Sequence, residues 1–329
     1  MKYAHCGLLL GVTFALVTAS SPLRAQSARN ENSWDALTDD SSRSMLFAAQ
    51  VIPAYESSDM PTQDKSKGLA IPQSFTFPKD ADTDVIEGHQ RQNSLFCVDV
   101  SHYTGTSISF SSLRLQSVRC VYAKATQGIK GKDGQFKSYW NALAKYSGLT
   151  VSPADRLSRG AYHFLSSSAP GKDQADAFVD YVNLNGGFLP GDLPPVMDLE
   201  WDVTAAQPVD QWRGQPTDKI VQNALAFLSR VKERTGRTPI IYTALSWWTD
   251  KTIPSSRFKE FKEYPLWIAD YNPKRKLSET PAVPNGAQTV LWQFSDRAHL
   301  NSGFSGGLDA SIFYGSEADF ASRFGLTGN

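Results

Sequence analysis

Short apolar runs recur along the chain beyond residue 94, and most of them end at a polar or charged residue. They are rich in β-branched and aromatic residues and are nearly continuous, which is typical of strands buried on both faces. The pattern predicts strands at 95–101, 118–125, 160–165, 193–200, 238–243, 265–270, 289–294 and 307–311.

Helical periodicity separates several of these runs. Apolar residues recur every three or four positions over 136–146, 172–184 and 216–235, and a glycine follows the last of these segments. Strands that alternate with helices predict parallel pairing in βα units. The last third is poor in helical patterns, which occur only at 257–261 and 317–324. We therefore expect an α/β fold, an irregular TIM-like β/α barrel with fewer helices than strands.

The first 93 residues differ in composition from the rest. Residues 1–25 combine Lys2, an apolar run and small residues, which is the pattern of a signal peptide. Residues 26–93 mix Ser, Asn, Asp and Pro without a sustained period, so we expect a largely unstructured, flexible leader or linker, with one docked segment as the alternative. The barrel domain is predicted at 94–329 and is expected to keep its activity without the leader.

Charge and composition narrow the partners. Lys and Arg number 33 and Asp and Glu number 33, so the formal net charge is zero and gives no argument for nucleic acid or an anionic membrane surface. No later run could span a bilayer. We expect an exported monomer, periplasmic or extracellular, with no membrane span in the mature chain. The five scattered His and the lack of C-x-x-C or H-E-x-x-H predict no metal and no cofactor.

Two cysteines remain once the signal peptide is removed. Cys97 and Cys120 lie in neighbouring strand-like runs and would reach an oxidising compartment. A disulfide and a pair of buried thiols are both compatible with the sequence, because adjacent parallel strands rarely bring two Cβ atoms within bridging distance.

The most distinctive stretch is Asp198-Leu199-Glu200, directly after the apolar pair Val196-Met197. In a strand, residues i and i+2 point to the same face, so the two carboxyl groups should lie side by side. Their like charges and loss of water should raise the pKa of at least one of them, which suits a general acid near neutral pH. The alternative is two solvated acids at a strand end.

Other strand ends add to this pair, because the chemistry of β/α barrels sits where the strands end. The expected ends carry Asp99, Lys124, His163, Tyr242, Gln293 and Asp309. Acids that cluster with aromatic residues and without a metal pattern favour glycoside hydrolysis.

Six motifs in order carry a resemblance to a known family: 96–101, 122–128, 160–164, 196–200, 266–269 and 291–294. Together they resemble glycoside hydrolase family 25, the Chalaropsis-type lysozymes, which are β-1,4-N-acetylmuramidases. The resemblance implies an irregular β/α barrel and hydrolysis of the bond between N-acetylmuramic acid and N-acetylglucosamine in peptidoglycan. It leaves open whether the reaction retains or inverts the anomeric configuration.

The resemblance also implies roles. Glu200 matches the general acid, and Asp198 matches the acid that stabilises the transition state or orients the 2-acetamido group. Asp99 and Asp309 match acids on the first and last strands. The expected substrate-binding residues are Tyr162, His163, Lys124, Tyr242, Trp267 and Gln293.

Some of these residues have other interpretations. His163 could be a core histidine, and Lys124 could pair with Asp99 for structural reasons. The chain departs from the family pattern at Thr104, Gln127 and Ser311, where the family usually has Gln, Glu and Asn. These departures leave the Asp198–Glu200 pair intact.

Two other functions compete with the muramidase. The first is a catalytically weak barrel that binds glycan through its aromatic residues. The second is another polysaccharide hydrolase, such as a chitinase. The D-x-x-D-x-D-x-E pattern of chitinases is absent from the stretch that begins at Leu193-Pro194-Pro195.

Overall fold

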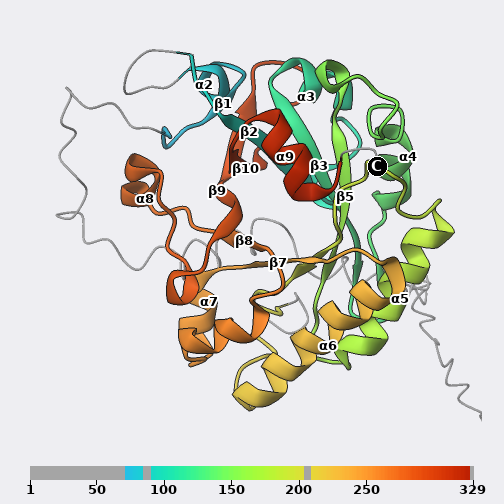
Figure 1. Ribbon diagram of the computed structural model, residues 1–329, viewed down its shortest axis with the longest axis vertical. Helices are drawn as coiled ribbons and strands as arrows, with labels where there is room; N and C mark the ends of the chain where they lie inside the picture. Colours follow the sequence, from blue (N-terminus) through green and yellow to red (C-terminus); the bar gives the residue numbers. More distant parts are fainter. Residues whose placement is uncertain (1–70, 84–89, 204–208, 327–329) are drawn as a thin grey trace, which may run out of the picture. The chain divides into compact units, whose positions relative to one another are not determined.

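Strands close into a barrel in the computed structural model, which describes residues 71–83, 90–203 and 209–326 (Figure 1). The signal peptide predicted at 1–25 lies outside these residues. Eight strands follow one another around the barrel, and β10 pairs with β2 to close it. They are β2 (Ser94–Val100), β3 (Val118–Gln127), β5 (Ser158–Phe164), β6 (Val196–Asp198), β7 (Ile240–Thr243), β8 (Leu266–Ala269), β9 (Thr289–Leu300) and β10 (Leu308–Tyr314).

The strands pair in two ways. From β2 through β3, β5, β6, β7 and β8 to β9 every neighbouring pair is parallel, as the alternation of strands and helices predicts. The pairs β9–β10 and β10–β2 are antiparallel, and they lie in the helix-poor last third, where the sequence predicts an irregular barrel. The connection from Leu300 to Leu308 is too short for a crossover and forms a hairpin instead.

The helices lie where the apolar periodicity predicts them. The longer ones are α4 (Phe136–Leu143), α5 (Gly171–Leu184), α6 (Thr217–Thr235) and α9 (Glu317–Phe324), and α6 ends at Gly236 in a left-handed C-cap. The segment predicted at 257–261 is part of a 3₁₀ helix, η5 (Ser255–Phe261). No helix within the described ranges is long and apolar enough to cross a membrane.

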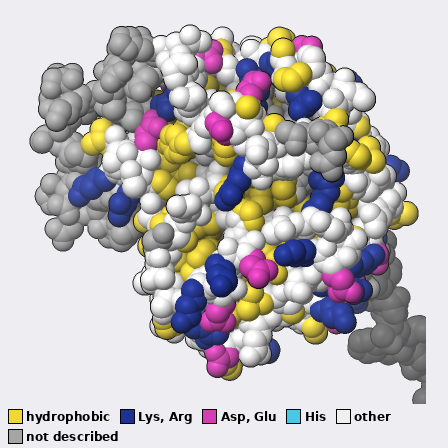
Figure 2. Space-filling view, viewed as in Figure 1, with side chains coloured by type: hydrophobic (Ala, Val, Ile, Leu, Met, Phe, Trp, Pro, Cys, Tyr) yellow, Lys and Arg dark blue, Asp and Glu magenta, His cyan; other side chains and the backbone are white. Residues whose placement is uncertain are grey.

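Short elements fill the connections. They are β1 (Thr76–Phe77), α2 (Lys79–Asp82), η3 (His102–Thr104), α3 (Phe110–Leu115), β4 (Gly131–Lys132), η4 (Pro153–Asp155), α7 (Leu245–Asp250), α8 (Pro273–Ser278) and η6 (Pro284–Gly286). On the face that Figure 2 presents, Lys and Arg side chains are interspersed with Asp and Glu.

A disulfide joins the first two barrel strands. Cys97 on β2 and Cys120 on β3 are register partners with Cα atoms 4.5 Å apart, and their sulfur atoms are bonded. Both residues are fully buried. Of the two alternatives that the sequence leaves open, the structure has the disulfide.

The end of the predicted leader packs against the barrel. Within 71–83, β1 pairs in parallel with the end of β9 at His299 and Leu300. Phe75 and Phe77 are fully buried and contact Phe96 of β2, and Phe75 also contacts Phe294 of β9. This segment is therefore docked on the barrel, an alternative that the sequence leaves open for one part of the leader. Its composition is mostly polar, so the burial of Phe75 and Phe77 could not be predicted from a periodic pattern.

A truncation series tests the contribution of this segment. A chain beginning at Ser94 should melt at a lower temperature than one beginning at Ile71, because it leaves Phe96 and Phe294 without their partners. In the full chain, Phe75→Ala should lower the free energy of unfolding by about 3–5 kcal/mol, the usual cost for a buried phenylalanine. Urea denaturation measures this cost. Leu184→Ala, at a side chain that is 78% exposed, is the control. Equal melting temperatures for the two truncated chains would contradict the expectation.

Candidate active site

A pocket of about 270 Å³ opens where the parallel barrel strands end. Five carboxylic acids line it, and they come from four strands and one loop. They are Asp99 on β2, Asp198 at the end of β6, Glu200 just beyond it, Asp296 on β9 and Asp309 on β10. The structure therefore brings together the four acids that the sequence predicts, Asp99, Asp198, Glu200 and Asp309.

Asp198 and Glu200 line the same pocket, as their spacing predicts. Their side chains are largely buried, at 5% and 9% exposure. The next residue, Trp201, is also buried, and its indole Nε1 donates to Asp250 Oδ2 at 2.8 Å. Trp201 therefore lies in the hydrophobic core and bonds to α7, as expected for a residue that alternates with Glu200.

The loop that carries Glu200 is fixed two residues later by Asp202. The Asp202 Oδ2 atom accepts hydrogen bonds from Ser166 Oγ, Ser167 N and Ser167 Oγ at 2.8–2.9 Å. The Asp202 backbone N–H donates to Asp210 Oδ1 at 2.8 Å. Burial raises the pKa of Asp202, and the hydrogen bonds from the two serines oppose that shift. These contacts tie the Glu200 loop to the segment that follows β5.

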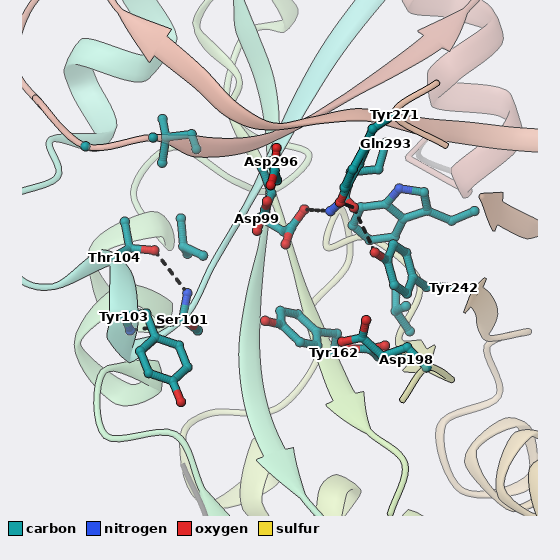
Figure 3. A pocket seen from close by; sticks show the side chains of 18 of the residues that line it. Asp99, Ser101, Tyr103, Thr104, Tyr162, Asp198, Tyr242, Tyr271, Gln293 and Asp296 are labelled. Atoms are coloured by element: carbon teal, nitrogen blue, oxygen red, sulfur yellow. Dashed lines mark hydrogen bonds between the residues drawn. The ribbon is translucent and has the colours of Figure 1, made fainter. Parts of the chain in front are cut away.

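Asp99 is oriented by a hydrogen-bonded chain, which Figure 3 shows in part. The side-chain Nε2 of Gln293 donates to Asp99 Oδ2 at 2.8 Å. The Gln293 Oε1 atom accepts from the hydroxyls of Tyr242 and Tyr271 at 2.7 and 2.6 Å. Burial and the neighbouring acids raise the pKa of both tyrosines well above the ordinary value, so both hydroxyls stay protonated and can donate. Gln293 and Tyr242, predicted as substrate-binding residues, both line the pocket and form this chain.

Asp309 lies directly opposite Asp99 in the β10–β2 register. Like charges facing each other across antiparallel strands are destabilising, so their pairing indicates a functional constraint. Asp296 adds a fifth acid that the sequence analysis missed. It lies three residues beyond Gln293, and the predicted strand ended at Phe294 whereas β9 continues to Leu300. On a regular strand Asp296 would point away from the face of Gln293, and the register shifts between β9 and β10 in this stretch interrupt that alternation.

Aromatic side chains complete the lining. Tyr162 and Trp267 both line the pocket, as predicted. Trp267 is only 2% exposed, and its Nε1 donates to Ser311 Oγ at 2.9 Å, so it forms the floor of the pocket. Tyr103 and Phe304 also line the pocket, and the sequence analysis missed both because they lie outside the predicted strands.

Two predicted substrate-binding residues are absent from the pocket lining. His163 follows Tyr162 on β5, and successive strand residues point to opposite faces, so both could not face the pocket. The His163 ring is fully buried, stacks on Phe227 at 4.7 Å and lies within hydrogen-bonding distance of Thr126 and Gln174. The prediction that His163 lines the cleft is wrong, and the alternative of a core histidine holds.

Lys124 is the second correction. It is fully buried, and its Nζ donates to Gln127 Oε1 at 2.9 Å and lies 5.1 Å from the centre of the Phe164 ring. The prediction that it binds substrate is not met, since it is not part of the pocket lining. Its contact with Gln127, one of the positions where the chain departs from the family pattern, gives that glutamine a structural role.

The buried histidine predicts a pH dependence of stability. Burial lowers the pKa of His163 from 6.5 to about 3, so the folded chain holds it neutral while the unfolded chain protonates it below about pH 6.5. Its contribution is therefore complete above pH 6.5 and is lost as pH falls towards 3, by up to about 1.4 kcal/mol per pH unit. Urea denaturation of His163→Gln between pH 7.5 and pH 4.5 should show a shallower loss than the parent chain. His299→Gln, at an exposed histidine, should keep the parent slope. Identical slopes for His163→Gln and the parent would contradict the expectation.

A closed β/α barrel with carboxylic acids crowded at the carboxyl ends of its strands is the architecture of a glycoside hydrolase. Comparison with known proteins agrees. Residues 98–302 match the sequence model of Glycosyl hydrolases family 25. This chain belongs to that family.

Individual relatives support the assignment. Lysozyme M1 of Streptomyces globisporus is 33% identical over 243 residues, which cover 72% of this chain and 71% of the relative. The N,O-diacetylmuramidase of Chalaropsis sp is 31% identical over 226 residues, or 65% of this chain and 93% of the relative. The crystal structure of the bacterial lysozyme from Streptomyces coelicolor is similar with a TM-score of 0.58 and 30% identity, covering 72% of this chain and 100% of that one.

Proposed function

We propose that this hydrolase is an exported N-acetylmuramidase. It cleaves the β-1,4 bond between N-acetylmuramic acid and N-acetylglucosamine in the glycan strands of bacterial peptidoglycan. The observation that carries the proposal is that Asp198 and Glu200 line one pocket with Asp99, Asp296 and Asp309. The names of two relatives, a lysozyme and an N,O-diacetylmuramidase, support this choice of substrate.

Glu200 serves as the general acid. In its carboxylic acid form it gives its proton to the glycosidic oxygen as the bond from that oxygen to the sugar carbon breaks, and the new hydroxyl leaves with the departing sugar. Water then supplies the hydroxyl on the other sugar, and its proton returns to the enzyme. The hydrogen bonds of Asp202, through its carboxylate to Ser166 and Ser167 and through its backbone N–H to Asp210, support this role because they fix the loop on which Glu200 lies.

Asp198 serves as an anion next to the reacting carbon. The transition state carries partial positive charge on the sugar ring, and a fixed carboxylate in a largely buried pocket stabilises it or orients the 2-acetamido group. Asp99 and Asp309 add negative potential from the neighbouring strands, and Gln293 holds Asp99 in place. Tyr162, Tyr242 and Trp267 supply the walls and floor for the saccharide.

The pocket is complete in one copy of the chain, which supports action as a monomer. Export follows from the signal-peptide pattern at the start of the sequence and from the location of the substrate outside the cytoplasm. No cofactor enters the reaction, because acid catalysis and charge stabilisation are supplied by side chains of this chain.

Product analysis tests the proposal against its two competitors. Purified peptidoglycan is digested, and the new reducing ends are identified by mass spectrometry. Muramic acid ends are expected. Glucosamine ends would indicate a different hydrolase, and binding without release would indicate the glycan-binding barrel. Glu200→Gln is nearly isosteric and should bind the substrate and release no ends, because it has no proton to donate. Full release by this variant would overturn the acid assignment.

Asp198→Asn separates the electrostatic role from a structural one. Loss of one preorganised charge at the reacting centre should lower kcat by about two to three orders of magnitude. The turnover of soluble glycan strands measures this loss. Asp218→Asn, at a side chain that is 76% exposed on α6, should leave kcat unchanged. A loss below tenfold for Asp198→Asn would assign that carboxylate a structural role.

A further inference from the structure

One wall of the pocket comes from the hairpin between β9 and β10. We define the rim hairpin as residues 296–308. Besides its acid Asp296, it contributes Phe304, Gly306, Gly307 and Leu308 to the pocket lining. Most other lining residues lie at the ends of the parallel strands or in the short η3 segment. The wall is therefore mainly an aromatic ring beside two residues without side chains.

The ring of Phe304 is placed by its neighbour. Phe304 is half-buried and packs against the hydrophobic core while it lines the pocket. A Cβ atom at Gly306 would lie 2.6 Å from Phe304 Cζ and 2.8 Å from Cε1, so any larger residue would displace the ring. Gly306 does not have a positive φ, so the backbone conformation does not require glycine here. The close approach of the Phe304 ring does.

The tip of the rim hairpin is held by Gln116, at the end of α3. This side chain is buried, its Nε2 donates to Ser302 O at 2.9 Å, and its Oε1 accepts from Asn301 N at 2.7 Å. One carboxamide thus satisfies a donor and an acceptor of a backbone that lies 185 residues further along the chain. A charged or apolar residue would lose at least one of the two bonds.

The leader strand holds the same arm of the hairpin, and it shares the backbone N–H of Asn301 with Gln116. The backbone N–H groups of His299 and Asn301 donate to the carbonyls of Phe75 and Phe77 at 2.8 and 3.0 Å. Both phenylalanines are buried against the barrel. They lie outside the range 98–302 that matches the family model.

We propose that Phe304 is a specificity-determining residue that stacks on a sugar ring of the bound glycan, and that Gln116 and β1 are positioning elements that hold it. The apolar face of a pyranose ring packs on an aromatic face much as one ring packs on another. The acids at the strand ends supply the chemistry, and the rim hairpin supplies affinity for the polymer beside the cleaved bond. This inference rests on the proposed function and deepens it.

Phe304→Ala tests the contact itself. On soluble peptidoglycan glycan strands it should raise KM by about five- to tenfold, the range of one aromatic contact, and change kcat by less than about twofold. Phe304→Tyr keeps the ring and should restore KM. An unchanged KM in Phe304→Ala would overturn the proposal, whether or not kcat falls.

Gly306→Ala tests the placement of the ring without removing it. It should raise KM as Phe304→Ala does. The double variant should be no worse than Phe304→Ala alone, because the ring that the new methyl group displaces is gone. Gly134→Ala is the matched control, since a Cβ there meets no atom within 4 Å and the backbone is ordinary. Additive effects in the double variant would contradict an action through Phe304.

Gln116→Met tests the positioning role. It should raise KM in the parent chain and have no effect on KM in the Phe304→Ala background, a result that simple destabilisation would not produce. Gln215→Met removes only a local bond to Gln211 O and serves as the control. If Gln116→Met does not fold, the Gly306 and Phe304 variants decide the question.

Binding separates this inference from the proposed function. The affinity of Glu200→Gln for the same glycan strands is measured by tryptophan fluorescence, with and without Phe304→Ala. If the parent chain releases no muramic acid ends, the muramidase proposal is overturned. The stacking role is then decided by the binding result alone. Equal affinities with and without the Phe304 ring would overturn the stacking role even if the enzyme is active.

Discussion

The crowding of carboxylates at one end of a barrel is the constraint on which the rest of this structure depends. Asp99 and Asp309 face each other across paired strands, and Asp198, Glu200 and Asp296 share their pocket. Such an arrangement opposes folding, because like charges repel and each group loses water. Neutral donors offset part of the cost. Gln293 and two protonated tyrosines hold Asp99 without neutralising it, so the negative potential is available to a substrate that becomes positive.

The strands and long helices could be predicted because burial produces a local pattern of apolar residues in the sequence. A strand covered on both faces needs a continuous apolar run, and a helix packed on one face needs apolar residues every three or four positions. The direction in which two strands pair produces no such pattern. The run at 289–294 has the composition of a buried strand of either direction, and it is the short connection to β10 that imposes antiparallel pairing. The docked part of the leader cannot be located from the sequence for a related reason, because two buried phenylalanines in a polar segment are too few to produce a period.

The site was predictable as far as alternation and strand ends determine it. Asp198 and Glu200 were expected on one face because they are two residues apart, and both line the pocket. The same rule explains why His163 does not line the pocket: it follows Tyr162 on β5, and Tyr162 faces the pocket. Phe304 could not be found in this way. It lies on a turn, and its position depends on Gly306 and on contacts with residues more than 180 positions away, none of which a local pattern records.

The antiparallel part of the barrel connects the leader to the active site. Parallel strands are joined by crossover segments that cover their outer face, whereas β9, β10 and β2 follow one another without a long helix between β9 and β10. The side of β2 and β9 that carries Phe96 and Phe294 is covered by Phe75 and Phe77 instead. Because β9 runs on into the rim hairpin, the segment that covers this face also bonds to the wall of the pocket. The segment ahead of the barrel is therefore linked through β9 to the wall of the pocket that Phe304 lines.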